Sequence, residues 1–388
     1  MQRAEQRSDV VTGQVDIARL AISIVGVVGL ILVLWWSFNF MSSEEVPRLA
    51  IAAVALAVGV FGIWALFFFS DNLVTQLPIR IASAIRPFVF VGPAIAVLTA
   101  FLVYPTINTL YLSLFNRDSS RFVGLENYVT AFTDGDFLLI FRNNIIWLIF
   151  VTAFAVGFGL LVAVLADRVK GEPVVKSFIF MPMAISFVGA SVIWRFVYAF
   201  KPEGTEQIGL LNAIWTGLGG EPVAWITKRS IDIPGVTAFF DNLLGVTVGI
   251  PLNTLMLIII MIWLQTGFAM VIISAAIKGV PSELLEAARI DGATEIQAFF
   301  RVTIPFISTT ILTVATTILI LVLKVFDIVF VMTSGQFATQ VIANEMYMQM
   351  FRWRDFGMGS ALAVILFLAV IPVIINNIRR WQEERYAR

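Results

Sequence analysis

Long apolar blocks are the feature of this sequence that most limits how it can fold. A helix rises about 1.5 Å per residue, so it needs about 20 apolar residues to cross a hydrocarbon layer of about 30 Å. Blocks of this kind cover residues 18–40, 48–70, 87–115, 143–166, 177–200, 250–276, 306–332 and 356–378. We therefore expect an all-α, polytopic transmembrane helical bundle with about eight spans.

Composition agrees with a membrane protein. Of the 388 residues, 59% are hydrophobic and 13% are charged, and the mean hydropathy is +0.91. A soluble domain usually carries about a quarter charged residues. The first apolar run, from Leu20 to Trp36, is too long for the core of a signal peptide, so we expect it to stay as a span. The third block holds Pro93 and Pro105, which predicts a kink or tilt within one span.

Lys and Arg set the expected orientation. With the N-terminus inside, the cytoplasmic segments carry the larger share of these residues, which predicts that both termini are cytoplasmic. The longest outside segment, about 201–249, is rich in Gly, Pro and Trp. Its Trp215 and Trp225 suit a partly ordered cap at the membrane interface.

Missing residue types exclude several function classes. The chain has no Cys and no His, which removes thiolate, iron–sulfur and imidazole chemistry, and we expect no metal site. Acids are scarce within the spans, which argues against an intramembrane hydrolase. No GxxxxGK[ST] loop occurs, so any ATP hydrolysis must come from a partner. A net charge of zero without long basic runs makes nucleic acid an unsuitable partner. These absences favour a transport subunit over an enzyme.

The loop between the sixth and seventh expected spans has the most informative pattern. Pro281 and Ser282 favour the start of a helix, and Gly292 favours its end. The pattern predicts a short exposed helix, a turn at Gly292 and a second short helix that returns to the membrane.

Residues within that short helix suit contact with another protein. Ala287 and Ala288 are small enough for a close approach, while Glu286 and Asp291 offer charge to a basic side chain. An ordinary amphipathic connector would show the same composition, so the pattern alone leaves both interpretations open.

A family resemblance favours the first interpretation. Glu286-Ala287-Ala288, Gly292 six residues after the glutamate, and Val302-Thr303-Ile304-Pro305 resemble the EAA loop of membrane subunits in ATP-binding-cassette (ABC) importers. The resemblance implies the type I ABC importer permease fold and a coupling helix within residues 278–305 that sits in a cleft of the partner ATPase. It implies that Glu286, Ala287, Ala288, Asp291 and Gly292 make this contact. ATP and Mg would belong to the partner, with no cofactor in this chain.

Most of the chain beyond about residue 85 is similar to the carbohydrate-importer branch, in the subunit like the larger membrane partner of the maltose importer. The matching segments are Gly124-Leu125-Glu126-Asn127-Tyr128, Asn144, Phe180-Met181-Pro182 and Lys324-Val325-Phe326-Asp327. Thr333-Ser334-Gly335-Gln336-Phe337 departs from the Gly-Gly-Pro of many relatives and resembles α-glucoside and glucosylglycerol permeases. We expect a two-span N-terminal extension, 1–85, and a six-span permease core, 86–388.

The seventh expected span carries a polar stripe. At about 100° per residue, one face within about 80° holds Thr309, Thr313, Thr316, Ile320, Lys324 and Asp327. A charge facing lipid costs on the order of 2.5–3.5 kcal/mol or more, so the stripe should face protein or a water-filled path. Alternatively, Lys324 and Asp327 pair with each other near the outer interface.

The sixth expected span offers groups for a sugar. Met261, Gln265 and Phe268 share a face, and an aromatic ring beside an amide suits a sugar, although helix packing by Met and Phe produces the same face. By resemblance, Phe268 occupies the place of a sugar-contacting tyrosine. We expect Gln265, Phe268, Lys324 and Asp327 along the substrate pathway.

These features predict a permease subunit of an ATP-driven importer for an α-glucoside or related di- or oligosaccharide, in the bacterial cytoplasmic (inner) membrane. The resemblance implies a second homologous permease subunit, an ATPase dimer and an extracytoplasmic sugar-binding protein as partners. The alternative is an ion-coupled secondary transporter. Such a protein tends to show internal repeats and coupling carboxylates at the midplane, and neither is evident in the sequence.

Overall fold

The fold is described from a computed structural model. It describes residues 17–43, 46–77, 79–167, 169–228 and 251–386. The regular elements among these residues are helices, and an isolated β-bridge joins Phe115 to Phe122. The chain forms two compact units, Met1–Ile107 and Asn108–Arg388. We expected a two-span N-terminal extension, 1–85, and a six-span permease core, 86–388. This division assigns spans to the permease core and does not describe compact units, so it stays a prediction.

Seven helices among the described residues are long and apolar enough to cross a membrane, and a bent pair of helices can make an eighth span. The seven are Leu20–Met41, Arg48–Thr75, Ile81–Leu112, Gly135–Ala166, Leu252–Lys278, Glu295–Leu323 and Phe356–Arg379. The expected all-α bundle of about eight spans is confirmed. The third span is one helix through Pro93 and Pro105, with a π-helical stretch at Thr99–Val103. A π-helical stretch makes room for a proline ring and offers new partners to the backbone groups that the proline leaves without a hydrogen bond.

The first unit consists of helices with few buried side chains. They are α2 (Ile17–Met41), α3 (Arg48–Ala57), α4 (Ile63–Thr75), α5 (Ile79–Leu98) and α6 (Tyr104–Leu112), of which α6 extends into the second unit. Helix α4 packs against α2 and α5. Phe67 stacks on Phe90 with ring centroids 5.7 Å apart, and Asp71 accepts a 2.8 Å ion pair from Arg86. The outer faces are apolar, as expected of helices surrounded by lipid or other spans.

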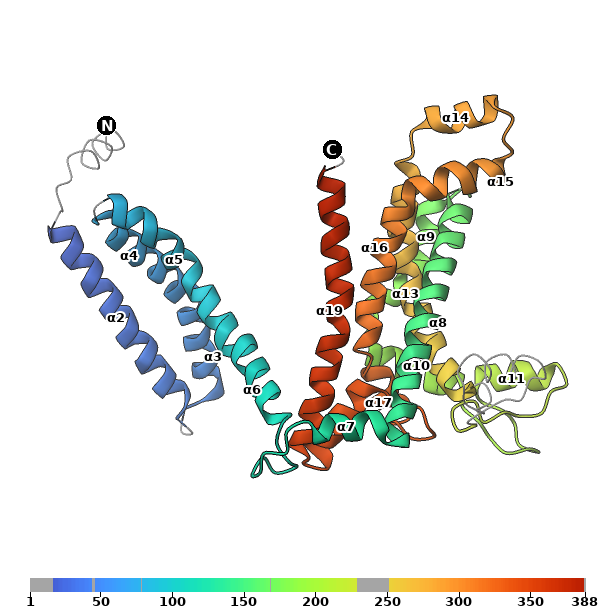
Figure 1. Cartoon of the computed structure of the whole chain (residues 1–388), viewed down its shortest axis with the longest axis horizontal. Coiled ribbons are helices and arrows are strands. Elements are labelled where there is room, and N and C mark those ends of the chain that lie inside the picture. Colours follow the sequence, from blue (N-terminus) through green and yellow to red (C-terminus); the bar gives the residue numbers. More distant parts are fainter. Residues whose placement is uncertain (1–16, 44–45, 78, 168, 229–250, 387–388) are drawn as a thin grey trace. The chain divides into compact units, whose positions relative to one another are not determined.

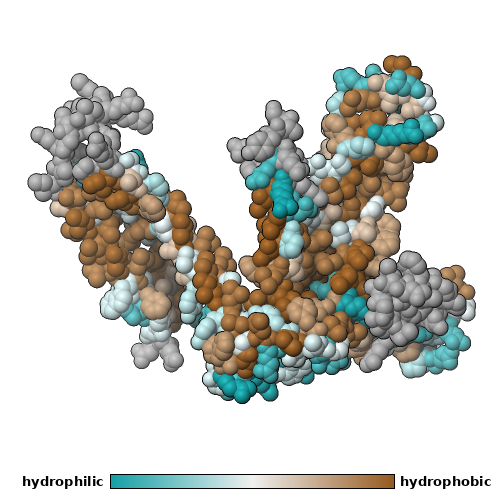
Figure 2. All heavy atoms as spheres, viewed as in Figure 1, coloured by the Kyte–Doolittle hydropathy of each residue, from teal (hydrophilic) through white to brown (hydrophobic). Residues whose placement is uncertain are grey.

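The second unit holds the remaining helices. They are α7 (Glu126–Thr133), α8 (Gly135–Ala166), α9 (Glu172–Phe180), α10 (Phe187–Val197), α11 (Leu210–Gly217), α13 (Leu252–Lys278), α14 (Ser282–Ile290), α15 (Glu295–Ala298), α16 (Ile304–Leu323), α17 (Asp327–Met332), α18 (Ile342–Tyr347) and α19 (Phe356–Tyr386). Within this unit, α14 and α15 lie at one end, and α7, α11 and α17 lie at the other (Figure 1). Hydrophobic side chains cover the long helices between these ends, and hydrophilic ones gather at the ends (Figure 2).

Helices α8 and α13 form the core of the second unit. Trp147 of α8 and Met261 of α13 are buried in one hydrophobic cluster. The backbones approach closely where small residues meet: a Cβ added to Gly159 would lie 2.4 Å from Cβ of Ala269. A Cβ added to Gly267 would lie 2.5 Å from a carbonyl oxygen of α9. Such contacts matter because lipid supplies no hydrophobic drive between membrane helices, which therefore associate largely by close packing.

The fifth expected span, 177–200, is broken, which the sequence analysis did not anticipate. Helix α9 continues into a 3-10 turn at Met181–Ala184, and the chain then bends by 102° into α10. The bend follows Pro182, and Ile185 is extended with ψ 136°. Ser186 caps α10 by accepting a 3.1 Å hydrogen bond from the backbone N–H of Gly189.

The seventh expected span, 306–332, is also interrupted. Helix α16 ends at Leu323, and α17 begins at Asp327 after three residues outside the helices. Asp327 therefore does not continue the face of α16, and the expectation of one helical stripe through Asp327 was wrong for this last member. The turn between α16 and α17 redirects the chain, so Asp327 lies in the first turn of a new helix.

The segment after α10 contains a small ordered region around Asn212. Its side-chain amide donates to the carbonyl oxygens of Ala199 and Val223 at 3.1 and 3.0 Å, and its oxygen accepts from the indole N–H of Trp225 at 2.9 Å. Trp225 packs against the main hydrophobic cluster. This agrees with the expected partly ordered cap; residues 229–250 of the predicted loop lie outside the described residues.

The contact between α8 and α13 allows a direct test of packing. Gly159→Ala should lower the free energy of unfolding by about 1–3 kcal/mol, because the new methyl group overlaps Ala269. Gly157→Ala is the matched control on the same helix, since nothing lies within 4 Å of its added Cβ. We expect the thermal unfolding temperature in detergent to fall for Gly159→Ala only. Equal unfolding temperatures for the two variants would contradict this packing.

Candidate functional site

The two broken spans meet at one place in the second unit. Helix α10 packs against α17, and the 3-10 turn after α9 packs against α13. Both breaks leave backbone groups outside regular helical hydrogen bonding. Within a membrane such backbone is tolerated only where protein buries it or where it lines a water-filled cavity. Discontinuous helices that meet near the middle of a bundle commonly form binding sites in transporters.

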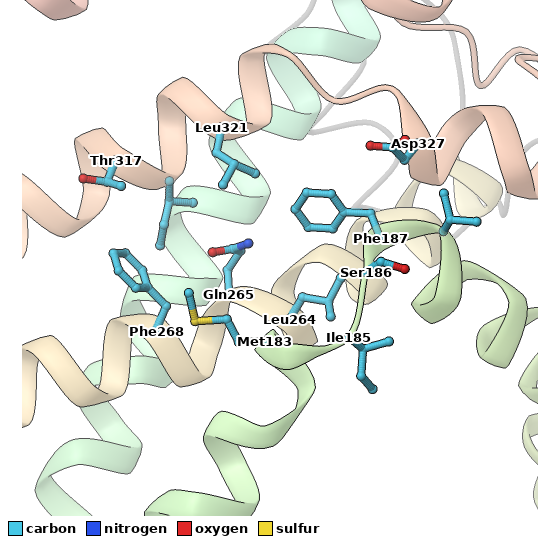
Figure 3. A pocket seen from close by; sticks show the side chains of 12 residues that line it. Met183, Ile185, Ser186, Phe187, Leu264, Gln265, Phe268, Thr317, Leu321 and Asp327 are labelled. Atoms are coloured by element: carbon cyan, nitrogen blue, oxygen red, sulfur yellow. The ribbon is translucent and has the colours of Figure 1, made fainter. Parts of the chain in front are cut away.

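A cavity of about 480 Å³ lies against the break in the fifth span, and we call it the central cavity. It is lined by Met183, Ile185, Ser186, Phe187, Val188, Leu264, Gln265, Phe268, Thr317, Ile318, Leu321 and Asp327. The side chains come from the α9–α10 break, from α13, from α16 and from the start of α17. Figure 3 shows the amide of Gln265 and the ring of Phe187 reaching toward the middle of the cavity, with Asp327 at its edge.

A second cavity of about 410 Å³ adjoins the first, and we call it the adjoining cavity. Phe187, Thr317, Leu321 and Asp327 line both. The adjoining cavity also contacts Met261, Ile320, Lys324, Val325, Phe326 and Ile328. The two cavities therefore lie next to each other beside both breaks, and we call them together the hollow.

Gln265 and Phe268 face the central cavity from α13. Gln265 is 5% exposed, and within the part of the chain that the structure describes its amide makes no hydrogen bond. A buried amide without a partner is costly, so a ligand or water in the cavity is its natural partner. Phe268 lies one turn along the same helix and offers a ring face. Met261, expected on the same side, lines the adjoining cavity.

Lys324 and Asp327 lie close in sequence but are not paired. No ion pair joins them among the described residues. Both line the adjoining cavity, and Asp327 also reaches the central cavity. The four expected pathway residues, Gln265, Phe268, Lys324 and Asp327, thus line two neighbouring cavities. The alternative, an ion pair between Lys324 and Asp327, is not formed among the described residues.

Three threonines of α16, Thr313, Thr316 and Thr317, donate their hydroxyl groups to carbonyl oxygens of their own helix. Thr313 donates to the carbonyl oxygen of Thr309 at 2.8 Å, and Thr317 donates to that of Thr313 at 2.9 Å. Thr317 lines both cavities. A row of such hydroxyls is mildly polar without the cost of unbonded donors.

The sequence analysis missed the contribution of the fifth span. Ser186 and Phe187 line the central cavity because the chain turns there. The available signal was Pro182 followed by the helix-start residue Ser186, a pattern that marks a break within a long apolar block.

At one end of the second unit, α14 stands clear of the bundle (Figure 1). None of its residues is buried, and Ile290 is 85% exposed. The helix starts at Ser282 and ends at Ile290, and Gly292 takes a φ of +82°, so the expected exposed helix, turn and second helix are observed. Glu286, Ala287, Ala288, Asp291 and Gly292 all lie on this protruding segment. These residues are therefore accessible to a partner protein.

An ion pair and a capping box stabilise the turn after α14. The carboxylate of Glu295 accepts from Nε of Arg289 at 2.8 Å and holds the pKa of Arg289 above its usual value. Glu286 adds to this effect through its charge. Thr294 and Gln297 form a reciprocal capping box at the start of α15, which fixes the direction of the second helix.

A cluster of charges joins three helices next to α14. Lys176 of α9 pairs with Asp167 at the end of α8 and, at 2.6 Å, with Glu172. Ser274 of α13 donates to Asp167 at 2.8 Å, and Lys278, the last residue of α13, pairs with Glu172. Side chains of Lys176 and Asp167 are mostly buried, so breaking one partner would leave an uncompensated charge. The cluster therefore ties the ends of α8, α9 and α13 together.

Metal chemistry finds no support in the described part of the chain. No group of three or more His, Cys, Asp or Glu side chains there is arranged to hold a metal ion.

A family model and curated relatives of this chain indicate the same family. Residues 155–388 match the family described as binding-protein-dependent transport system inner membrane component. The osmoprotective compounds uptake permease protein GgtC of Synechocystis sp. is 54% identical over 299 residues, covering 77% of this chain and 100% of GgtC. The α-glucoside transport system permease protein AglF of Rhizobium meliloti is 47% identical over 349 residues, covering 86% of this chain and 98% of AglF.

A solved structure shares the fold. The crystal structure of a bacterial ABC transporter that imports the acidic polysaccharide alginate aligns with a TM-score of 0.62 and 20% sequence identity. The alignment covers 78% of this chain and 99% of the other. The arrangement of helices is thus that of an ABC importer membrane subunit.

The hollow beside the two breaks should contain water. Because the chain has no Cys, a single introduced thiol can be labelled without background from the chain itself. Leu321→Cys, which lines both cavities, should react with a small hydrophilic thiosulfonate, since the reagent needs an ionised thiol in water. Val314→Cys is the control, because Val314 is 1% exposed on the same helix. Equal resistance of both positions to the reagent would contradict a hydrated hollow.

Proposed function

The chain belongs to the family of binding-protein-dependent transport system inner membrane components, the permease subunits of ABC importers, and from this premise we propose that it carries an α-glucoside or related glycoside through the bacterial inner membrane. The observation that carries the proposal is the hollow at two broken spans, lined by an unpartnered amide and three aromatic rings. Family membership favours this role over an ion-coupled secondary transporter.

The chemistry of the central cavity supports a glycoside as substrate. A sugar presents hydroxyl groups at its edges and C–H groups on its faces, so it needs planar polar side chains together with aromatic surfaces. Gln265 and Asp327 supply hydrogen-bonding groups, and Phe187 and Phe268 supply ring faces. The names of the relatives AglF and GgtC indicate α-glucosides and osmoprotective compounds as the range to test.

We assign coupling to an ATPase to the protruding helix α14. Glu286, Ala287, Ala288, Asp291 and Gly292 lie on an exposed segment that is free to enter a groove of a partner. The sequence has no P-loop of its own, so ATP and Mg would be bound by that partner. The positive φ of Gly292 allows the chain to turn between α14 and α15. The Arg289–Glu295 ion pair and the capping box at Thr294 hold this turn, which would let the segment act as one lever.

Helices α9 and α13 connect α14 mechanically to the hollow. Lys278 ends α13 immediately before this segment, and the charge cluster fastens that end to α9. Both helices reach the central cavity, α13 through Gln265 and α9 through the turn that contains Met183. A displacement of α14 would therefore move two walls of the cavity together. ATP binding would draw the coupling helices inward and open the hollow outward, and hydrolysis would reset it.

We propose the partners that this mechanism requires. The exposed threonine face of α16 needs protein or water on its other side, which a second homologous permease would supply. An ATPase dimer would receive α14 on the cytoplasmic side, where both termini would also lie. The family description names a binding protein, and we place that sugar-binding subunit at the opposite end of the bundle. The N-terminal two-span segment, 1–85, would lie outside the six-span core.

Removing the aromatic or amide group of the cavity should weaken transport. Phe268→Ala and Gln265→Leu should each lower kcat/KM for sugar uptake about tenfold, the effect of losing about 1.4 kcal/mol of transition-state stabilisation. Thr266→Val is the control, because its hydroxyl bonds to the carbonyl oxygen of Ile262 in its own helix. Uptake in proteoliposomes with the partner subunits measures the effect. Unchanged uptake in both cavity variants would move the substrate site elsewhere.

Altering α14 should uncouple ATP hydrolysis from sugar. Glu286→Gln and Gly292→Ala should lower sugar-stimulated ATPase activity severalfold while insertion into the membrane stays normal. For Gly292 the cause is strain, since a side chain at φ +82° costs about 1–2 kcal/mol. Glu283→Gln, one turn earlier on the same helix, is the matched control. Wild-type stimulation in both test variants would refute the coupling assignment.

A further inference from the structure

A third cavity lies at the opposite end of the second unit from α14, and we call it the outer cavity. It has a volume of about 580 Å³ and shares no lining residue with the central or adjoining cavity. Its chemically active lining residues include Asp134, Asp136, Gln340, Glu345, Gln349 and Trp353. They come from the start of α8, from the segment between α17 and α18, and from α18 with the turn after it.

A buried carboxyl group organises the floor of this cavity. Glu345 is 6% exposed and accepts hydrogen bonds from the side-chain amides of Gln340 at 2.6 Å and Gln349 at 2.8 Å. Burial raises the pKa of Glu345, and the negative charge of Asp136 acts in the same direction. The three side chains hold one another in place, which is how a polar site is organised before a ligand arrives.

One wall of the outer cavity is built from strained backbone. Ser334, Gly335 and Ala338 line it with φ values of 53°, 78° and 62°, and Phe337 beside them has a φ of 59°. A residue other than glycine in this region costs about 1–2 kcal/mol. Strain of this kind persists only where surrounding structure enforces it, and it gathers at functional sites.

Buried asparagines enforce this strained backbone. Asn143 of α8 donates to the carbonyl oxygens of Ala338 and Gln340 at 2.8 and 2.9 Å. Asn253 of α13 donates to that of Phe337 at 2.6 Å. Both asparagines are buried, so the core of the bundle fixes the shape of the wall. The wall contains the segment in which the sequence departs from the Gly-Gly-Pro of many importer relatives.

The arrangement combines planar hydrogen-bonding groups with an aromatic surface. Amides and carboxyl groups can each bind two adjacent hydroxyls of a polyol, and the half-exposed indole of Trp353 offers a flat apolar face. Charge adds selectivity: among the described residues that line the cavity, Asp134 and Asp136 outnumber the single basic one, Arg352. The resulting negative potential disfavours anionic ligands.

From these observations we propose that the outer cavity is a second sugar-binding site, which holds an uncharged glycoside before it enters the central cavity. The proposal rests on the proposed function, because it assumes that the chain transports a glycoside. It adds a binding step at the outer end of the bundle and a rejection of uronic and sulfonated sugars at that step.

A thiol-protection experiment tests the site. The experiment uses the nucleotide-free transporter complex without its binding protein. A hydrophilic maleimide should label Gln336→Cys at the rim of the cavity, and the label is measured on this chain only. Maltose, trehalose, sucrose and glucosylglycerol are the uncharged probes, and glucuronic acid is the anionic one. At about ten times its dissociation constant, an effective probe should slow labelling about tenfold. Thr205→Cys, exposed and outside the three cavities, should show no protection.

A second substitution distinguishes sugar binding in the outer cavity from nonspecific shielding of the introduced thiol. Gln349→Leu should raise the dissociation constant of the protecting sugar about tenfold, since one hydrogen bond to the ligand and one to Glu345 are lost. Phe351→Leu is the control, because Phe351 lies on the same turn, contacts Tyr347 with tilted rings and does not line the cavity. Protection that glucuronic acid gives equally well, or that Gln349→Leu leaves unchanged, would overturn the proposal.

The remaining outcomes distinguish the two proposals. If a sugar stimulates ATP hydrolysis by the complete transporter with its binding protein but never protects Gln336→Cys, the outer site is wrong and the proposed function stands. If the binding protein alone protects this position without sugar, the cavity is a protein-docking surface and the outer site is likewise wrong. If no glycoside stimulates ATP hydrolysis or uptake at all, the proposed function itself fails.

Discussion

Backbone hydrogen bonding within a lipid layer is the constraint on which this structure depends. Helices satisfy their own polar groups, which is why the long apolar blocks fold as spans and why a break in a span needs protein or water around it. Two spans break here, after Met181–Ala184 and after Leu323, and both breaks adjoin the same hollow. The interrupted backbone and the unpartnered amide of Gln265 thus mark a place within the bundle that we expect to be hydrated.

Mechanical connection follows from how the helices are fastened. Close packing of Gly159 on Ala269 holds α8 to α13, and the cluster around Lys176 holds the ends of α8, α9 and α13. Three residues separate the end of α13 from the short helix α14, so a partner that moves α14 would move this fastened group. In the proposed mechanism, the fastened helix ends would transmit motion from the ATPase, and the broken helices would form the substrate site.

Sequence reasoning predicted the elements that depend on local chemistry. The length of the apolar blocks predicted the spans. Pro281, Ser282 and Gly292 predicted the protruding helix and its turn, because a few adjacent residues determine where a helix starts and ends. It missed the breaks that redirect the fifth and seventh spans, so Asp327 was placed on the wrong helix. Apolar composition is the same on both sides of such a break, and the contribution of Phe187 to the cavity depends on tertiary packing.

The most direct test of the account is purification of the chain from membranes in mild detergent, with its bound subunits identified by mass and ATP hydrolysis measured in the presence of the binding protein. We predict that an ATPase and a second permease are recovered, and that one member of a panel of α-glucosides and glucosylglycerol raises ATP hydrolysis. Recovery of the chain without an ATPase, in membranes that still take up the sugar, would contradict a role for α14 in coupling.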